Sequence, residues 1–128
     1  MKNGGAAPAK RWWSGFGHAL EGFLWAVRTE KHMQFHVAAA AAAVALGLYA
    51  GLTGGEWLWI ALAIAFVWSA ELINTAVERA VDLYGPEHTP LGKAAKDTAA
   101  AAALVASAFA LVVALAVLLP ALVDRLRT

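Results

Sequence analysis

The chain has 128 residues, of which 61% are hydrophobic and 15% are charged, and its mean hydropathy is +0.61. This composition is too apolar for an ordinary water-soluble domain, and the length corresponds to a single domain. The absence of cysteine excludes disulfide frameworks, thiolate nucleophiles and cysteine-based zinc sites, and a net charge of +1 gives no basis for nucleic-acid binding.

The first element expected along the chain is an amphipathic helix over residues 11–30, after a disordered tail of residues 1–10. Its apolar residues recur at three- and four-residue spacing, and tryptophans and basic residues flank them. This pattern is typical of a helix that lies in the membrane interface. A helix packed on the protein itself is the alternative.

Three apolar stretches follow, and a helix needs about 20 residues to cross a bilayer. The first and third reach that length, whereas the second reaches it only if it includes the polar segment 71–81. We expect spans at about residues 33–52, 57–83 and 96–120, with Pro120 marking the end of the third. The sequence therefore predicts an all-α membrane protein in which residues 11–128 form a single domain.

The distribution of lysine and arginine predicts the orientation of these spans. The N-terminal segment carries five basic residues and the second loop three, whereas the first loop carries none and the C-terminus two. The N-terminus and the second loop are therefore expected in the cytoplasm, with the protein in the cell membrane. Alanine tracts at 38–43 and 99–103 allow close helix contacts in an oligomer, although alanine also fills a helix at little cost.

The second span ends in a polar stripe, which is the most informative feature of the sequence. Helical periodicity places five of its polar residues on one face: Glu71, Asn74, Thr75, Glu78 and Asp82. A carboxylate at membrane depth costs about 2.5–3.5 kcal/mol, so it should face protein, water or a cation. No lysine or arginine lies within the apolar cores. A divalent cation such as Mg²⁺ is then the expected counter-charge, and a buried polar network between helices is the alternative.

Two further polar features have weaker interpretations. His32 and His36 lie four residues apart and could in principle bind zinc, but no suitably placed carboxylate stands between them. Basic and acidic residues at the feet of the first and third spans suit a metal-bound polyphosphate, although solvated flanks are also basic. The glycine-rich nucleotide-binding motifs are absent from the sequence.

Three motifs resemble those of a known family. They are "RTE" at 28–30, "ELINTAVERAVDL" at 71–83 and "PLGKAAKD" at 90–97. In order and spacing, residues 11–120 resemble the small prokaryotic diacylglycerol kinase family, most closely its undecaprenol kinase branch. The resemblance implies a homotrimer of three-span subunits, each with a surface helix, that uses Mg²⁺ to transfer the γ-phosphate of ATP to a lipid hydroxyl at the cytoplasmic interface.

The resemblance also implies roles for individual residues. Glu71 would be the general base and would contact the lipid substrate, and Glu30 and Glu78 would bind the metal. The nucleotide would be contacted by Arg11, Glu30, Asn74, Glu78, Asp82, Glu87, Lys96 and Asp97. Undecaprenol is the lipid alcohol that the resemblance favours, and diacylglycerol is the alternative.

The family pattern is not kept at His32, His88 and Thr89, which affects the expected nucleotide contacts and the surroundings of the metal. Two other classes of function are compatible with an apolar chain that carries intramembrane carboxylates. An ion pathway is disfavoured because the polar groups cluster at one end of the second span. A non-catalytic assembly protein would remain functional when Glu71 is replaced by glutamine, whereas a kinase would not.

Overall fold

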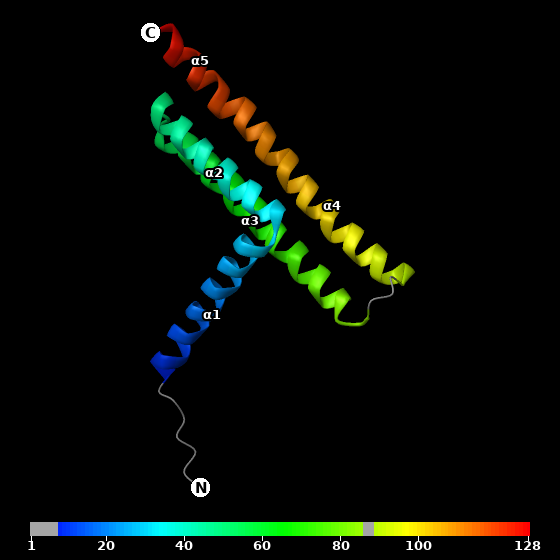
Figure 1. Ribbon diagram of the computed structural model, residues 1–128. Helices are drawn as coiled ribbons and strands as arrows, with labels where there is room; N and C mark the ends of the chain where they lie inside the picture. The colour runs from blue at the N-terminus through cyan, green and yellow to red at the C-terminus, as the bar shows by residue number, and fades with distance from the viewer. Residues whose placement is uncertain (1–7, 86–88) are drawn as a thin grey trace.

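The computed structural model describes residues 8–85 and 89–128, and every regular element in this part of the chain is a helix (Figure 1). The helical segments are α1 (Pro8–Thr29), α2 (Lys31–Ala50), α3 (Gly54–Asp82), α4 (Pro90–Val113), the π-helical turn η1 (Ala114–Leu118) and α5 (Leu119–Arg127). Three stretches are long and apolar enough to cross a membrane: Lys31–Ala50, Gly54–Asp82 and Pro90–Arg127. The expected all-α membrane fold is confirmed. Helix α1 begins before the expected start at residue 11, and residues 1–7 lie outside the described part.

The turn between α2 and α3 is short because both helix ends have their backbone groups satisfied. Gly51 ends α2 in the left-handed conformation, with φ of 73°, and its N–H donates to the carbonyl of Gly47. The hydroxyl of Thr53 then accepts from the N–H of Glu56, whose carboxylate accepts from the N–H of Thr53 at 2.8 Å. This reciprocal pair is a capping box. Glu56 therefore has a structural role at the end of the bundle far from the polar stripe.

Pro120 does not end the third helix, contrary to the expectation from the sequence. The helix that starts at Pro90 continues through η1 and α5 to Arg127. Proline lacks the N–H that a regular helix uses, and its ring clashes with the carbonyl four residues earlier. The wider π-turn at Ala114–Leu118 ends two residues before Pro120 and accommodates it. This continuation was not evident from the sequence, because proline usually terminates a helix.

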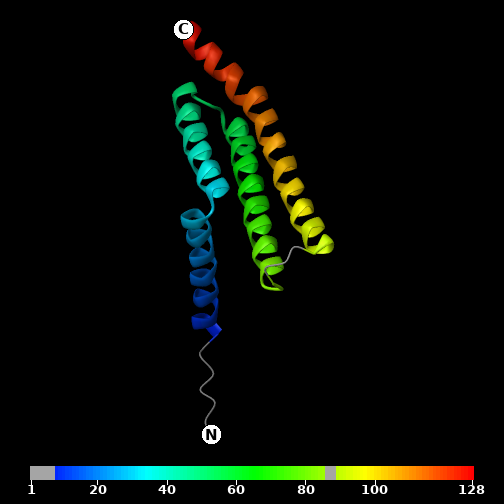
Figure 2. The ribbon, with the colours of Figure 1, turned by 45° about the vertical axis from the view of Figure 1, so that its right-hand side comes forward.

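Helix α3 lies between α2 and α4, with its most extensive contact against α4 (Figure 2). Among the described residues, α2 packs on α3 but reaches the last helix only through η1 and α5. The apolar core sits there, at the end of the bundle opposite the polar stripe. It comprises Leu52, Ile60, Ala63, Val113 and Leu118. Because α2 and α4 do not pack together, space remains between them toward the polar end.

Helix α1 extends away from the three-helix bundle, beyond the start of α2 (Figure 2). Near its C-terminal end it packs on the bundle, where Ala26 is buried and the rings of Phe23 and Trp68 are 5.3 Å apart. Farther out, Trp12 and Phe16 are exposed. Exposed aromatic side chains on an amphipathic helix suit the membrane interface, and the packed end fixes the helix to the half of the bundle that carries the polar stripe.

Candidate active site

The polar stripe of α3 faces the interior of the bundle. Glu71, Asn74 and Thr75 are buried, with 6%, 8% and 7% of their surface exposed, whereas Ile73 is 62% exposed. Helical periodicity brings the three polar residues onto the same side, and the packing of α2 and α4 covers that side. These three side chains are therefore shielded from lipid, as the cost of placing a carboxylate in hydrocarbon requires, whereas Asp82 at the end of the stripe is exposed.

Glu71 faces a histidine of the neighbouring helix. The Nε2 atom of His36 in α2 lies 3.1 Å from Oε1 of Glu71, and the two side chains are 15% and 8% exposed. This partner differs from the divalent cation that the sequence suggests for Glu71, and from the zinc site that the spacing of His32 and His36 allows. A lone histidine near the start of an apolar span was the available signal. The periodicity of α2 alone does not say which of its faces meets α3.

The position of His36 is supported by contacts on three helices. The indole N–H of Trp68 in α3 donates to the carbonyl oxygen of His36 at 3.4 Å, and Phe23 of α1 packs on the same indole. The ring of Phe35 meets the imidazole edge-on, with centroids 5.2 Å apart. These contacts fix the height of α2 against α3 at the level of Glu71.

One turn further along α3, Asn74 and Glu78 form a second polar pair. The Nδ2 of Asn74 donates to Oε1 of Glu78 at 3.2 Å. The Oδ1 of Asn74 is buried, and it has no hydrogen-bond partner among the described residues. An unpaired buried amide oxygen beside a carboxylate is a combination of hard oxygen donors that suits Mg²⁺.

Glu30, at the junction of α1 and α2, is brought to the stripe by an ion pair with Arg79 of α3. Arg79 also lies over the ring of Trp25, 5.4 Å from its centroid, and interacts electrostatically with Glu78 and Asp82. The structure thus places Glu30 near the end of the stripe that carries Glu78 and Asp82, although Glu30 and Arg79 are 49 residues apart in sequence. The ion pair of Arg79 with Glu30 was not evident from the sequence, where Arg79 is one of the basic residues that predict the orientation.

The start of α4 contributes Lys96 and Asp97, two further charged residues that the family resemblance implicates. Lys96 forms an ion pair with Asp82 that joins α4 to the end of α3, and Asp97 pairs with Lys93 within α4. The structure therefore brings Lys96 and Asp82 together, with Asp97 on the same helical turn as Lys96. The side chain of Arg11, and residues Glu87 and His88, lie outside the described part of the chain.

The described residues do not contain a preassembled metal centre. No group of three or more histidine, aspartate or glutamate side chains lies close enough there to hold an ion. The zinc interpretation of His32 and His36 therefore gains no support. Mg²⁺ has lesser requirements, since it keeps several waters and is bound by one or two carboxylates together with the phosphates of a substrate. The donors at Asn74 and Glu78 fit that mode of binding.

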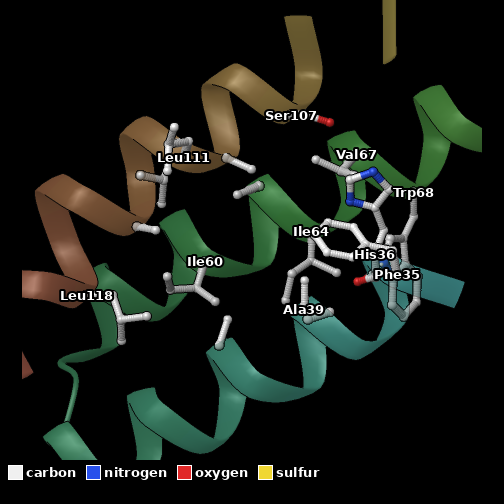
Figure 3. A pocket seen from close by; sticks show the side chains of 16 residues that line it. Phe35, His36, Ala39, Ile60, Ile64, Val67, Trp68, Ser107, Leu111 and Leu118 are labelled. Carbon is white, nitrogen blue, oxygen red and sulfur yellow. Dashed lines mark hydrogen bonds between the residues drawn. The ribbon is translucent and has the colours of Figure 1, made fainter. Parts of the chain in front are cut away.

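An apolar groove of about 290 Å³ lies between α2, α3 and α4 (Figure 3). Its walls are alanine, valine, isoleucine, leucine and phenylalanine side chains, except for His36, the Trp68 indole and Ser107. The Ser107 hydroxyl donates to the carbonyl of Ala103 in its own helix, so it offers little polarity to the groove. His36 belongs both to the wall of the groove and to the pair with Glu71, and it links the two features.

Residues 17–118 match the sequence model of a family described as prokaryotic diacylglycerol kinase. The chain belongs to this family. It is 43% identical over 112 residues to the undecaprenol kinase of Bacillus subtilis, and the aligned region covers 88% of this chain and 91% of that protein. It is 34% identical over 110 residues to the diacylglycerol kinase of a Synechocystis species, over 85% of this chain and 63% of the relative. The diacylglycerol kinase of Helicobacter pylori is 44% identical over 54 residues, 42% of each chain.

These relatives identify the protein as a membrane lipid kinase and confirm the resemblance seen in the sequence motifs. A kinase of this family implies a phosphoryl donor such as ATP and a lipid acceptor. The relatives give no support to an ion pathway or a non-catalytic assembly protein, the two other classes weighed from the sequence.

Proposed function

We propose that this kinase transfers the γ-phosphate of ATP to the hydroxyl of undecaprenol, in the presence of Mg²⁺. The observation that carries the proposal is the buried Glu71, paired with His36 at the polar end of an apolar groove. A hydrocarbon chain lying in that groove would bring a terminal hydroxyl to the carboxylate. Phosphoryl transfer depends mainly on positioning and on neutralising charge, so a small site of this kind is sufficient.

In this mechanism Glu71 acts as the general base. Its carboxylate takes the proton of the lipid hydroxyl while the hydroxyl oxygen attacks the γ-phosphorus. The bond between that phosphorus and the bridging oxygen breaks, and ADP leaves with the electron pair. Burial keeps water from the reacting oxygen, so the lipid rather than water receives the phosphoryl group.

Glu30 and Glu78 would hold Mg²⁺, with Asn74 next to Glu78 supporting the arrangement. The unpaired Oδ1 of Asn74 and the hydrogen bond that its Nδ2 donates to Glu78 support the part of this assignment that concerns Glu78. When bound, the ion would neutralise negative charge on the phosphates. Glu30 is paired with Arg79 in the structure, so its carboxylate already lies in a place where positive charge is favourable.

The remaining residues that the family pattern implicates would contact the nucleotide at the foot of the bundle. Lys96 and Asp82 meet there, and Asp97 lies on the adjacent face of α4. A lysine beside carboxylates can bind a phosphate oxygen while the carboxylates bind ribose hydroxyls or metal-bound water. Arg11 and Glu87 are proposed for the same role from the family pattern alone.

The lipid acceptor is proposed to be undecaprenol because the B. subtilis relative carries that name and aligns over most of both chains. Two other relatives are named diacylglycerol kinases, so diacylglycerol is the second candidate.

We also propose that the active unit is a trimer with its polar end in the cytoplasm. Most of each membrane-spanning segment is unburied in a single chain, with 17%, 33% and 22% of the apolar windows buried. Alanine-rich faces allow other copies to approach closely. The excess of lysine and arginine at the polar end supports a cytoplasmic location.

The test is phosphate transfer by the purified protein in lipid–detergent micelles with Mg²⁺ and radiolabelled ATP. Undecaprenol and diacylglycerol are offered separately and then together at equal concentration. Glu71→Gln is compared with Glu56→Gln, which makes the same change in the capping box, where glutamine can still cap the helix.

The proposal expects label in undecaprenol with the wild type and with Glu56→Gln, but no detectable label with Glu71→Gln. Label mainly in diacylglycerol would show that diacylglycerol is the acceptor in place of undecaprenol, and the proposed roles of the site residues would stand. Full activity of Glu71→Gln would contradict the role of Glu71.

A further inference from the structure

We infer that His36 is a positioning residue for Glu71, and that it fixes which carboxylate oxygen takes the proton of the lipid hydroxyl. The inference rests on the proposed function. The imidazole holds Oε1 of Glu71 through its Nε2–H, and this leaves Oε2 as the oxygen that receives the proton. Neither the sequence motifs nor the names of the relatives assign a role to this histidine.

The geometry provides the first argument. The 3.1 Å separation of His36 Nε2 and Glu71 Oε1 brings the two atoms close enough for the N–H to donate to the carboxylate. Both side chains are largely buried, so water competes little for either group. Within the described residues, His36 is the side chain that pairs with Glu71. The nearby amide of Asn74 does not compete for Glu71, since its Nδ2 donates to Glu78.

The surroundings of the imidazole provide the second argument. From α3, Glu71 is the charged group that meets it, and Trp68 binds the His36 carbonyl oxygen through its indole. From α4, the groove wall near His36 offers Ser107, whose hydroxyl is used within its own helix. The rest of the groove wall is uncharged (Figure 3). Among the described residues, Glu71 is therefore the charged acceptor within reach of the imidazole.

The chemistry of the two groups provides the third argument. An imidazolium and a neutral imidazole with its proton on Nε2 both donate from this atom, so the role does not depend on the charge of His36. During transfer, Oε2 gains the hydroxyl proton, the lipid oxygen bonds to the γ-phosphorus, and the bond to ADP breaks. His36 keeps its own proton throughout. A carboxylate held at one oxygen cannot rotate away from its substrate, which is how supporting residues raise the rate of reaction.

The test compares His36→Leu with His36→Gln. Leucine fills similar space without a donor, whereas the glutamine Nε2 can place an N–H near the position of the histidine Nε2. His18→Leu is the matched control, because His18 is an exposed histidine on α1 that pairs weakly with Glu21 at 3.5 Å. We measure kcat and KM for ATP and lipid, together with the oligomeric state and thermal stability of each variant.

We expect His36→Leu to lower kcat about 10- to 100-fold with little change in the KM for ATP, and His36→Gln to recover most of the loss. The His18→Leu control should retain the wild-type kcat. Recovery by glutamine is a result that a purely structural role would not produce. The inference is overturned if glutamine is as inactive as leucine, or if His36→Leu keeps the wild-type kcat per assembled oligomer.

A second measurement does not depend on activity. Nitrogen-15 NMR of protein labelled at histidine reports which ring nitrogen of His36 carries a proton. We expect a protonated Nε2 whose resonance shifts in Glu71→Gln. An unprotonated Nε2 in the wild type would overturn the inference even if lipid phosphorylation were normal. Conversely, a wild-type protein that phosphorylates no lipid would defeat the proposed function, and the NMR result would still decide whether His36 donates to Glu71.

Discussion

The ring of Trp57 in α3 lies so close over Gly47 in α2 that a Cβ atom built on the glycine would be 2.7 Å from the ring and 2.9 Å from Leu52. This contact joins the two helices beside the apolar core, far from the polar stripe. It is possible only because glycine has no side chain.

We predict that Gly47→Val destabilises the protein by about 1–3 kcal/mol, the usual cost of overpacking a close contact. The measurement is the midpoint of denaturation in detergent. Gly22→Val is the control, because a Cβ at Gly22 would meet no atom within 4 Å. Equal stability of the two variants would show that Trp57 moves aside without cost.

Asn74→Ala should lower kcat about 10- to 100-fold, the usual effect of losing a residue that orients a metal ligand. Its effect on stability should be limited to one hydrogen bond, about 0.5–1.5 kcal/mol, because Oδ1 has no partner to lose. The measurement is kcat against Mg²⁺ concentration. Thr98→Ala serves as control, since that hydroxyl bonds only to Ala94 of its own helix. A destabilised but fully active Asn74→Ala protein would place the residue outside the site.

Arg79→Gln should reduce the Mg²⁺ concentration needed for half-maximal rate, because the carboxylate of Glu30 would no longer be paired with a fixed positive charge. The Arg79 side chain is 51% exposed, so solvent screens its charge, whereas the Glu30 side chain is 17% exposed; the midpoint of denaturation checks that the variant stays folded. Arg127→Gln, at the far end of α5, is the control. An increase in the KM for ATP instead would show that Arg79 binds phosphate.

The orientation can be measured directly because the chain contains no cysteine that would react in the background. In intact spheroplasts, a membrane-impermeant maleimide should label Thr128→Cys but not Tyr84→Cys, which lies in the second loop and is 97% exposed. Permeabilisation should make Tyr84→Cys reactive. The opposite pattern would place the polar end outside the cell and contradict the distribution of basic residues.

The helices and the stripe could be predicted from the sequence because both depend on local periodicity. Three apolar stretches and the spacing of Glu71, Asn74 and Glu78 determine the spans and the common face. The contact of His36 with Glu71 was not predictable in this way, because it depends on how α2 is rotated against α3. That rotation results from nonlocal packing, including the hydrogen bond from Trp68.

Two other features escaped the sequence for different physical reasons. The ion pair of Glu30 with Arg79 joins residues 49 positions apart, and opposite charges alone do not identify which pairs will meet. At Pro120, the local rule was correct about the lost hydrogen bond but wrong about its consequence. A π-turn absorbed the defect, and the helix continued to Arg127.

The confinement of polar groups to one half of α3 bears on the fate of the product. From Trp57 to Ala70 the helix carries no charged side chain, and Ser69 is its one hydroxyl. A newly phosphorylated head group carries a charge of about −1.5 to −2. That half of α3 has no charged group that could compensate this charge while the head group crossed the hydrocarbon. The enzyme would therefore release its product into the leaflet from which the alcohol came. Any use of the lipid phosphate on the opposite surface would require a separate flippase.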